Sequence, residues 1–242
     1  MYLYKFSYVI NLLCANLFRK LFLFYIYMSD SYEKKILCDE PLVYTISNFI
    51  DDETCNHFIE KAKLSLGAAL VADDNKGTTS KGRTNTNCWI SHNTDSITMK
   101  VAKDIADVVG LPVENAESFQ VVHYDTEQRY NGHFDAFVKD DTERNRRLLK
   151  RGGQRMITAL VYLNDVEEGG HTSFANLKID VAPDKKKLLV FHNCYPGTTK
   201  RHANSLHAGT PPTKGEKYAF NLWFREQKFN SVYEYNADDF KE

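Results

Sequence analysis

The sequence of 242 residues lacks the features that mark several classes of protein. Its five cysteines are odd in number and scattered, and no two form a C-x-x-C pair. A structural zinc site or a dense disulfide framework is therefore not expected, although one bridge stays open. The formal net charge of −1 gives no general electrostatic attraction to nucleic acid, so no nucleic-acid partner is expected. A basic run at residues 144–151 is a separate, local feature.

An uninterrupted apolar run long enough to cross a membrane is also missing. Two shorter apolar runs, 6–18 and 21–28, are separated by Arg19 and Lys20. Together they approach the ~20 apolar residues of a membrane span. A central charge, however, costs on the order of 2.5–3.5 kcal/mol. Residues 1–34 are interpreted as a hydrophobic leader and linker, serving as a signal, an anchor or an untargeted leader. The first two roles would place the protein in the secretory pathway or the endoplasmic reticulum membrane, and the third in the cytoplasm.

Residues 35–242 are expected to form one catalytic domain. The chain is 43% apolar and 26% charged, as is usual for a soluble globular protein, and this length can bury a full core. Helical spacing predicts one helix over 52–66, ended by Gly67, and a second over 93–109, capped by Asn93 or Thr94. Nothing in the sequence fixes the oligomeric state, and a monomer would suffice.

Short β-rich runs follow residue 117. They are predicted as strands at 119–124, 156–163, 187–192 and 217–225, whereas 73–87 and the charged stretch 138–151 are predicted as loops. Helices followed by many short strands indicate an α+β fold whose catalytic half is a β-sandwich or jelly roll.

The strand predicted at 217–225 has two different faces. Because side chains alternate along a strand, one face carries only apolar residues at 218, 220, 222 and 224. The other face carries Lys217, Asn221, Trp223 and Arg225 beside Ala219. This second face fits either the inner wall of a ligand cavity or a surface in water.

A His-x-Asp sequence, His133 and Asp135, places an imidazole and a carboxylate on the same side of an extended segment. His207 could supply a third ligand, although His123, His171, His192 and His202 are not excluded by spacing. Two histidines and one carboxylate form the ligand set of non-haem iron(II) oxygenases. Lys217 follows His207 by ten residues, and a buried lysine needs a carboxylate partner, which a dicarboxylic co-substrate would supply.

These motifs, in this order, resemble the prolyl 4-hydroxylases within the 2-oxoglutarate dioxygenases. The resemblance runs from Pro41 to Glu226 and is greatest to compact, catalytic-domain-only members from plants, algae and algal viruses. The stretches that carry it are ESFQVVHY (117–124), YNGHFD (130–135), GGQR (152–155), YLNDVEEGGHT (162–172), and HAGTP through GEK (207–217).

The resemblance implies the fold, the cofactors and the site residues. It implies a double-stranded β-helix (jelly-roll) core with supporting N-terminal helices. It places the iron(II) ligands at His133, Asp135 and His207. The implied contacts to 2-oxoglutarate are Lys217, Thr172 and Tyr124, and those to a peptide are Arg155, Trp223 and Tyr130.

The implied reaction is hydroxylation of peptidyl proline to 4-hydroxyproline in proline-rich or collagen-like sequences. It consumes O2 and 2-oxoglutarate, releases succinate and CO2, and uses L-ascorbate to maintain the iron. Three alternatives stay open: a dioxygenase acting on another substrate, a zinc hydrolase, and a non-catalytic jelly-roll binding module. The segment 82–87 departs from the family's substrate-covering loop, which leaves the peptide preference open.

Overall fold

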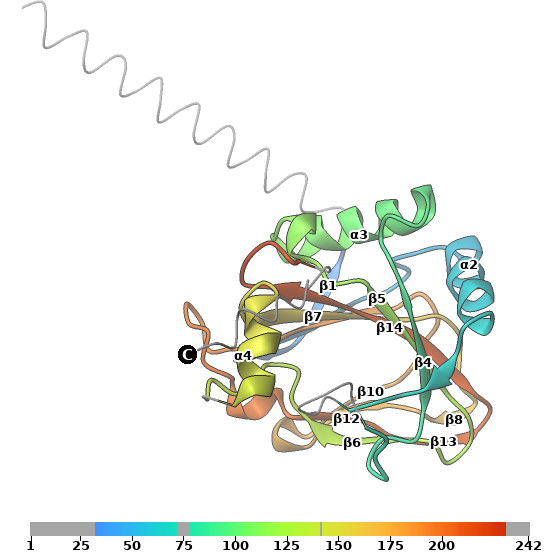
Figure 1. Cartoon of the computed structure of the whole chain (residues 1–242). Coiled ribbons are helices and arrows are strands. Elements are labelled where there is room, and N and C mark those ends of the chain that lie inside the picture. The colour runs from blue at the N-terminus through green and yellow to red at the C-terminus, as the bar shows by residue number, and fades with distance from the viewer. Residues whose placement is uncertain (1–31, 72–77, 141, 231–242) are drawn as a thin grey trace, which may run out of the picture. The chain divides into compact units, whose positions relative to one another are not determined.

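The computed structural model describes residues 32–71, 78–140 and 142–230, and those from Lys34 onward belong to one compact unit (Figure 1). The expected leader lies almost entirely outside the described residues, so its role and the domain boundary stay predictions. Within the described ranges, no helix has the length and apolar character needed to span a membrane. The four cysteines in these ranges are free thiols, namely Cys38, Cys55, Cys88 and Cys194.

Antiparallel strands build two main sheets. The larger has the order β1-β2-β11-β7-β14-β5-β4-β3, the smaller has the order β10-β9-β12-β6, and β13 pairs with β8. The larger sheet contains β1 Lys34–Asp39, β2 Leu42–Ile46, β3 Gly67–Ala68, β4 Thr86–Ile90, β5 Phe119–Tyr124, β7 Arg155–Tyr162, β11 Leu188–His192 and β14 Lys217–Arg225. The others are β6 Tyr130–His133, β8 Glu168–Gly169, β9 Thr172–Phe174, β10 Ile179–Val181, β12 His207–Gly209 and β13 Pro212–Lys214.

The two main sheets share one apolar core. Phe174 and Val181 of the smaller sheet pack with Tyr162 and Phe191 of the larger one, and the ring centroids of Phe174 and Phe191 are 5.1 Å apart. Figure 1 shows the two sheets facing each other, with helices against the larger sheet. This is the α+β jelly roll predicted from the sequence, and the strands predicted near 119, 156, 187 and 217 are confirmed within one residue.

Helices α2 Asp52–Lys63 and α3 Ser96–Val109 cover the larger sheet. In α2, Phe58 lies 4.6 Å from Phe220, centroid to centroid, and this helix ends three residues before the predicted end. The predicted cap of α3 was wrong. Asp95 caps the helix because its carboxylate accepts from the Thr98 amide at 2.9 Å, while Thr98 Oγ1 accepts from the Asp95 amide.

The loop predicted over 138–151 was also wrong, because residues Glu143–Lys150 form helix α4. Thr142 caps it by accepting from the Asn145 amide, Glu143 lies in the first turn, and basic residues occupy the last turn. The stretch contains few apolar residues, so no repeated apolar positions at helical spacing indicated a helix. The predicted loop over 73–87 was partly wrong, since β4 begins at Thr86. Three short 3-10 turns complete the described chain, at Val113–Asn115, Ala175–Leu177 and Ala203–Ser205.

Candidate metal centre and co-substrate pocket

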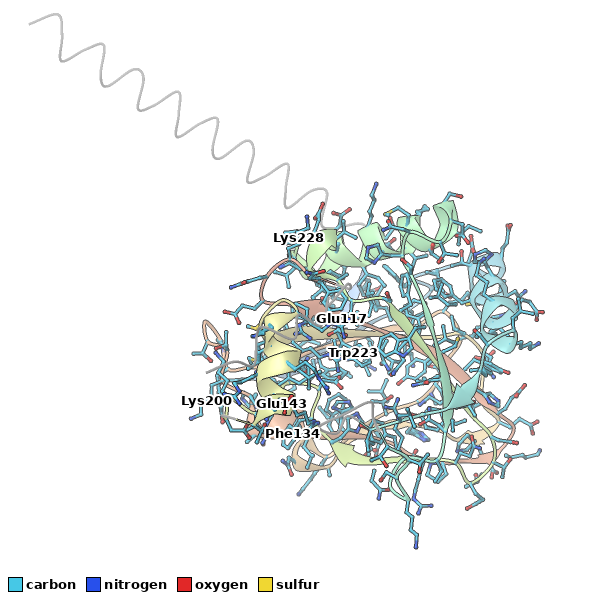
Figure 2. All side chains as sticks on the ribbon, viewed as in Figure 1. Glu117, Phe134, Glu143, Lys200, Trp223 and Lys228 are labelled. Carbon is cyan, nitrogen blue, oxygen red and sulfur yellow. The ribbon has the colours of Figure 1, made fainter. Side chains whose placement is uncertain are left out.

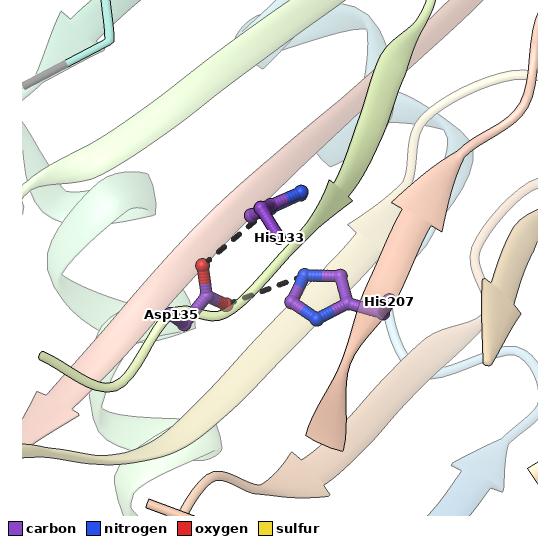
Figure 3. A group of neighbouring side chains, drawn as sticks. All are labelled: His133, Asp135 and His207. Atoms are coloured by element: carbon purple, nitrogen blue, oxygen red, sulfur yellow. Dashed lines mark ion pairs between the residues drawn. The ribbon is translucent and has the colours of Figure 1, made fainter. Parts of the chain in front are cut away.

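Two histidines and one aspartate meet where the smaller sheet faces the larger one. His133 in β6 and His207 in β12 are direct cross-strand partners, and Asp135 follows β6 by two residues. Asp135 Oδ1 lies 3.8 Å from His133 Nε2, and Oδ2 lies 3.6 Å from His207 Nε2 (Figure 3). One ligand atom from each of the three residues lies within 4.8 Å of the others, which is close enough to hold one ion.

The orientation of both imidazoles favours metal binding. Each Nδ1 lies 2.9 Å from a backbone carbonyl two residues earlier, that of Asn131 for His133 and that of Ser205 for His207. These carbonyls accept the Nδ1–H, so each Nε2 carries a lone pair toward Asp135. Burial lowers the pKa of His133, which favours the neutral ring that a metal requires.

Buried hydrogen bonds fix the carboxylate of Asp135. Thr158 Oγ1 in β7 donates to Asp135 Oδ2 at 2.7 Å, and Asn193 Nδ2 donates to Thr158 Oγ1 at 2.8 Å. Burial alone would raise the pKa of Asp135, but positive charge on His207 or His133, together with that of Arg155, outweighs burial and lowers it. One carboxylate and two imidazoles form the donor set of a facial triad that leaves further positions open, and this set fits iron(II).

Lys217 lies deep in the same cavity without an acidic partner. It is only 2% exposed, and its Nζ lies 5.2 Å and 5.4 Å from the ring centroids of Tyr124 and Tyr162. Among the described residues, no carboxylate forms an ion pair with it. Burial lowers its pKa to about 7. A buried ammonium of this kind is a site for an anion, and the distal carboxylate of 2-oxoglutarate fits it.

Hydroxyl groups surround this lysine. Thr172 in β9 is buried, and its Oγ1 accepts from the Tyr162 hydroxyl at 2.7 Å, which leaves its own proton to be donated elsewhere. The Tyr124 hydroxyl lies against Gly209, where a Cβ would come within 3.0 Å of it. Gly209 therefore keeps space for the phenol beside the candidate pocket.

The three predicted peptide contacts line the same cavity. The Arg155 guanidinium stacks 3.7 Å above the ring centroid of Trp223, and it also forms two hydrogen bonds to Glu117, of 2.6 and 2.8 Å. Tyr130 stacks on His133 with centroids 3.6 Å apart. Arg155 therefore has a structural partner in addition to any role in binding.

One cavity of about 670 Å³ joins these groups, and all nine predicted site residues line it. Sequence reasoning missed four residues that support it: Arg83, Glu117, Thr158 and Tyr162. A lone threonine within the apolar strand β7 was the available signal for Thr158, since its side chain shares a face with Leu160 and Tyr162. Glu117 gave no such signal, because Arg155 and Arg225 are distant in sequence. Arg83 lies 4.4 Å from the ring centroid of Tyr130 and donates to Gln120 as well as to nearby Asn85, and only the last of these partners is close in sequence.

Comparisons with known proteins agree with this geometry. Residues 119–225 match the model of the 2OG-Fe(II) oxygenase superfamily. A probable prolyl 4-hydroxylase 7 of Arabidopsis thaliana is 35% identical over 213 residues, which is 80% of this chain and 65% of that protein. A putative prolyl 4-hydroxylase of Acanthamoeba polyphaga mimivirus is 36% identical over 187 residues, covering 77% of this chain and 75% of the relative.

A solved structure is similar as well. It is the viral collagen prolyl hydroxylase of Paramecium Bursaria Chlorella virus-1 in a complex with 2OG, superposed with a TM-score of 0.62 and 29% identity. The match covers 78% of this chain and 98% of the viral chain.

Proposed function

The chain belongs to the prolyl 4-hydroxylase family of the 2OG-Fe(II) oxygenase superfamily, and we propose that it hydroxylates proline in proline-rich or collagen-like peptides. It is an oxidoreductase that uses iron(II) and 2-oxoglutarate, and the family implies O2 and L-ascorbate as well. The zinc-hydrolase and binding-module alternatives are set aside by this membership.

The observation that carries the proposal is the placement of Lys217 in the cavity of the triad. A buried lysine without a carboxylate partner among the described residues is costly unless a ligand supplies the negative charge. The mechanism of a zinc hydrolase would leave this buried lysine unexplained. A co-substrate with a carboxylate at its far end would pair with the ammonium group of Lys217.

Each residue then has a stated role. His133 and His207 would hold iron(II) through Nε2, and Asp135 through its carboxylate, which Thr158 keeps in place. When bound, iron(II) and 2-oxoglutarate would supply the oxidation, which splits O2 between succinate and the new hydroxyl group as CO2 leaves. Lys217 would pair with the distal carboxylate, with Thr172 and Tyr124 as hydroxyl partners.

The groups that would orient the peptide are Trp223, Arg155 and Tyr130. A proline-rich peptide is already extended as polyproline II, so binding in an aromatic groove costs little ordering entropy. The stack of Arg155 on Trp223 holds the indole in one orientation, and Glu117 holds Arg155. The chain thus contributes positioning and exclusion of water, and the bound groups contribute the oxidation.

Mass spectrometry of a proline-rich peptide after incubation tests this function. With iron(II), ascorbate and 2-oxoglutarate we expect one oxygen atom added to a proline and identification of 4-hydroxyproline after hydrolysis. Omission of 2-oxoglutarate should abolish the product. Oxygen found only on other residues, or only without 2-oxoglutarate, would contradict the proposal.

A further inference from the structure

Lys217 lies at the beginning of β14, where the pairing with both neighbouring strands ends. Toward β5 the last pair is Lys217 with Tyr124, and toward β7 the last pair is Ala219 with Tyr162. Because β7 ends at Tyr162, no strand in the described part of the chain pairs with Lys217 on that side. The position of the lysine therefore depends on the group that replaces the missing strand partner.

The side chain of Asn164 provides this replacement. The Leu163 amide donates to the Tyr218 carbonyl at 2.9 Å, as it would in a further strand pair. The Tyr218 amide, however, donates to Oδ1 of Asn164 at 2.6 Å, so a side-chain oxygen takes the place of a strand carbonyl. Asn164 Nδ2 donates to the Glu216 carbonyl at 2.8 Å. One carboxamide thus holds the backbone on both sides of Lys217.

The turn before Lys217 faces solvent. Residues 213–216 are exposed, and Gly215 has a φ of +83°, which glycine adopts without strain. Lys217 itself is only 2% exposed. The chain therefore passes from an exposed turn to a buried lysine within one residue, and the carboxamide of Asn164 lies at that boundary.

A second contact also holds this turn, but it is more exposed. Glu216 Oε2 lies 2.8 Å from His123 Nε2, and the Glu216 side chain is 56% exposed. An ion pair in contact with water contributes little to holding a backbone in place. Among these contacts, the two hydrogen bonds from Asn164 to the backbone should therefore contribute most to the position of Lys217.

Strand β14 connects this lysine to the metal ligands. Trp223 pairs with Thr158 of β7, and Thr158 donates to the carboxylate of Asp135. Figure 2 shows Trp223 close to Glu117, whose amide donates to the Trp223 carbonyl at 2.9 Å. A shift of Lys217 relative to β14 therefore changes the distance between its ammonium and the triad. A dicarboxylic acid that must reach both groups would be selected by its length.

We infer that Asn164 is a positioning residue that sets the distance between the Lys217 ammonium and the iron ligands, and thereby selects an oxo-acid of the length of 2-oxoglutarate. This inference rests on the role proposed for Lys217 and names a residue that determines co-substrate length. A carboxamide suits this task because it accepts and donates at once. Being uncharged, it also does not compete with the co-substrate for the ammonium.

Equilibrium binding of two oxo-acids tests this inference. They are 2-oxoglutarate and 2-oxoadipate, which is longer by one methylene, and titration calorimetry with iron(II)-loaded protein without oxygen measures each Kd. The wild type should bind 2-oxoglutarate more tightly. Asn164→Ala should weaken 2-oxoglutarate binding by ~10-fold, because two hydrogen bonds to the backbone are lost. Binding of 2-oxoadipate should weaken much less, since a lysine that is no longer held can retreat from a longer acid.

The ratio of the two Kd values is the decisive quantity. Partial unfolding of a variant would reduce the binding of both acids alike and leave this ratio unchanged. A smaller ratio in Asn164→Ala than in the wild type therefore supports positioning. A ratio equal to that of the wild type would overturn the inference.

Two further variants locate the effect. Asn164→Asp keeps the acceptor for the Tyr218 amide, and water can replace the lost donor at exposed Glu216, so this variant should retain most of the wild-type ratio. Asn115 is a matched control, because it is also half-buried and donates to a β14 carbonyl, that of Arg225 at 3.1 Å. Asn115→Ala should keep the ratio. Equal loss of selectivity in Asn164→Ala and either of these variants would contradict the inference.

Product analysis separates this inference from the proposed function. If the Kd ratios change as expected but a proline-rich peptide contains no 4-hydroxyproline after oxygen is admitted, the function fails and the inference stands. If the wild type forms 4-hydroxyproline while Asn164→Ala keeps the wild-type ratio, the function stands and the inference fails.

Discussion

Lys217 and Tyr124 are direct cross-strand partners in β14 and β5, and Lys217 Nζ lies 5.2 Å from the centre of the phenol ring. Side chains of directly opposed residues project to the same face of a sheet, so the ammonium and the phenol enter the cavity together. The ring shields the charge from water without neutralising it. This pair therefore defines one end of the proposed co-substrate pocket.

Replacement of this lysine should act mainly on 2-oxoglutarate. In Lys217→Ala we expect the KM for 2-oxoglutarate to rise on the order of 100-fold, because removing one partner of a desolvated charge pair is costly. The peptide KM should change much less. Kinetics with each substrate varied in turn measure both values, and unchanged 2-oxoglutarate kinetics would refute the anchor role.

The lowered pKa of Lys217, about 7, predicts a pH dependence of co-substrate affinity. Below this pH the lysine is already protonated and binds the carboxylate directly. Above it, binding must also take up a proton, so the apparent KM should rise by up to ~10-fold per pH unit. Arginine stays charged throughout, so Lys217→Arg should show a flatter profile. A KM for 2-oxoglutarate independent of pH between 6 and 9 in the wild type would contradict this.

Thr158 should increase the affinity for iron(II) indirectly, by orienting the carboxylate of Asp135. Thr158→Val keeps the shape but removes the donor to Asp135 Oδ2, and such outer contacts change metal affinity by ~10–100-fold. Thr158→Ser should largely restore it. Titration of the protein with iron(II) in the absence of oxygen measures the affinities, and equal values in the Val and Ser variants would remove the positioning role.

Trp223 and Arg155 should differ in their effects although both line the peptide region. Trp223→Ala should raise the peptide KM while 2-oxoglutarate decarboxylation without peptide survives. Arg155→Ala should also raise that KM, and in addition lower the melting temperature, because it removes one of two arginines that neutralise buried Glu117. Wild-type peptide KM in both variants would place the groove elsewhere.

Local patterns predicted much of this fold. Strands β5 and β14 follow directly from runs of β-branched and aromatic residues, and the alternation in β14 correctly separated the face of Phe220 from that of Trp223. Helix α4 escaped prediction because its stability comes from the cap at Thr142, the buried Asn145 and contacts to distant residues. Tertiary contacts of this kind leave little trace in local periodicity.

In the candidate site, too, local spacing predicted some residues, whereas others are brought together only by contacts between distant parts of the chain. The His-x-Asp spacing correctly predicted that His133 and Asp135 project to the same side of the chain. Spacing alone, however, did not determine which other histidine is the third metal ligand. The pairing of β6 with β12 brings His207 to His133, and this register depends on the whole smaller sheet. The bond from Thr158 to Asp135 and the triad of Glu117, Arg155 and Arg225 likewise arise only when distant strands meet.

The release of labelled CO2 from 2-oxo[1-14C]glutarate, measured with 4-hydroxyproline in the same reaction, tests the central claim most directly. With iron(II), ascorbate and a proline-rich peptide, the wild type should form CO2 and 4-hydroxyproline in nearly equal amounts. His133→Ala, Asp135→Ala and His207→Ala should form neither while remaining folded by circular dichroism. Near-normal yields of both products from the His207→Ala variant would contradict the proposed iron centre.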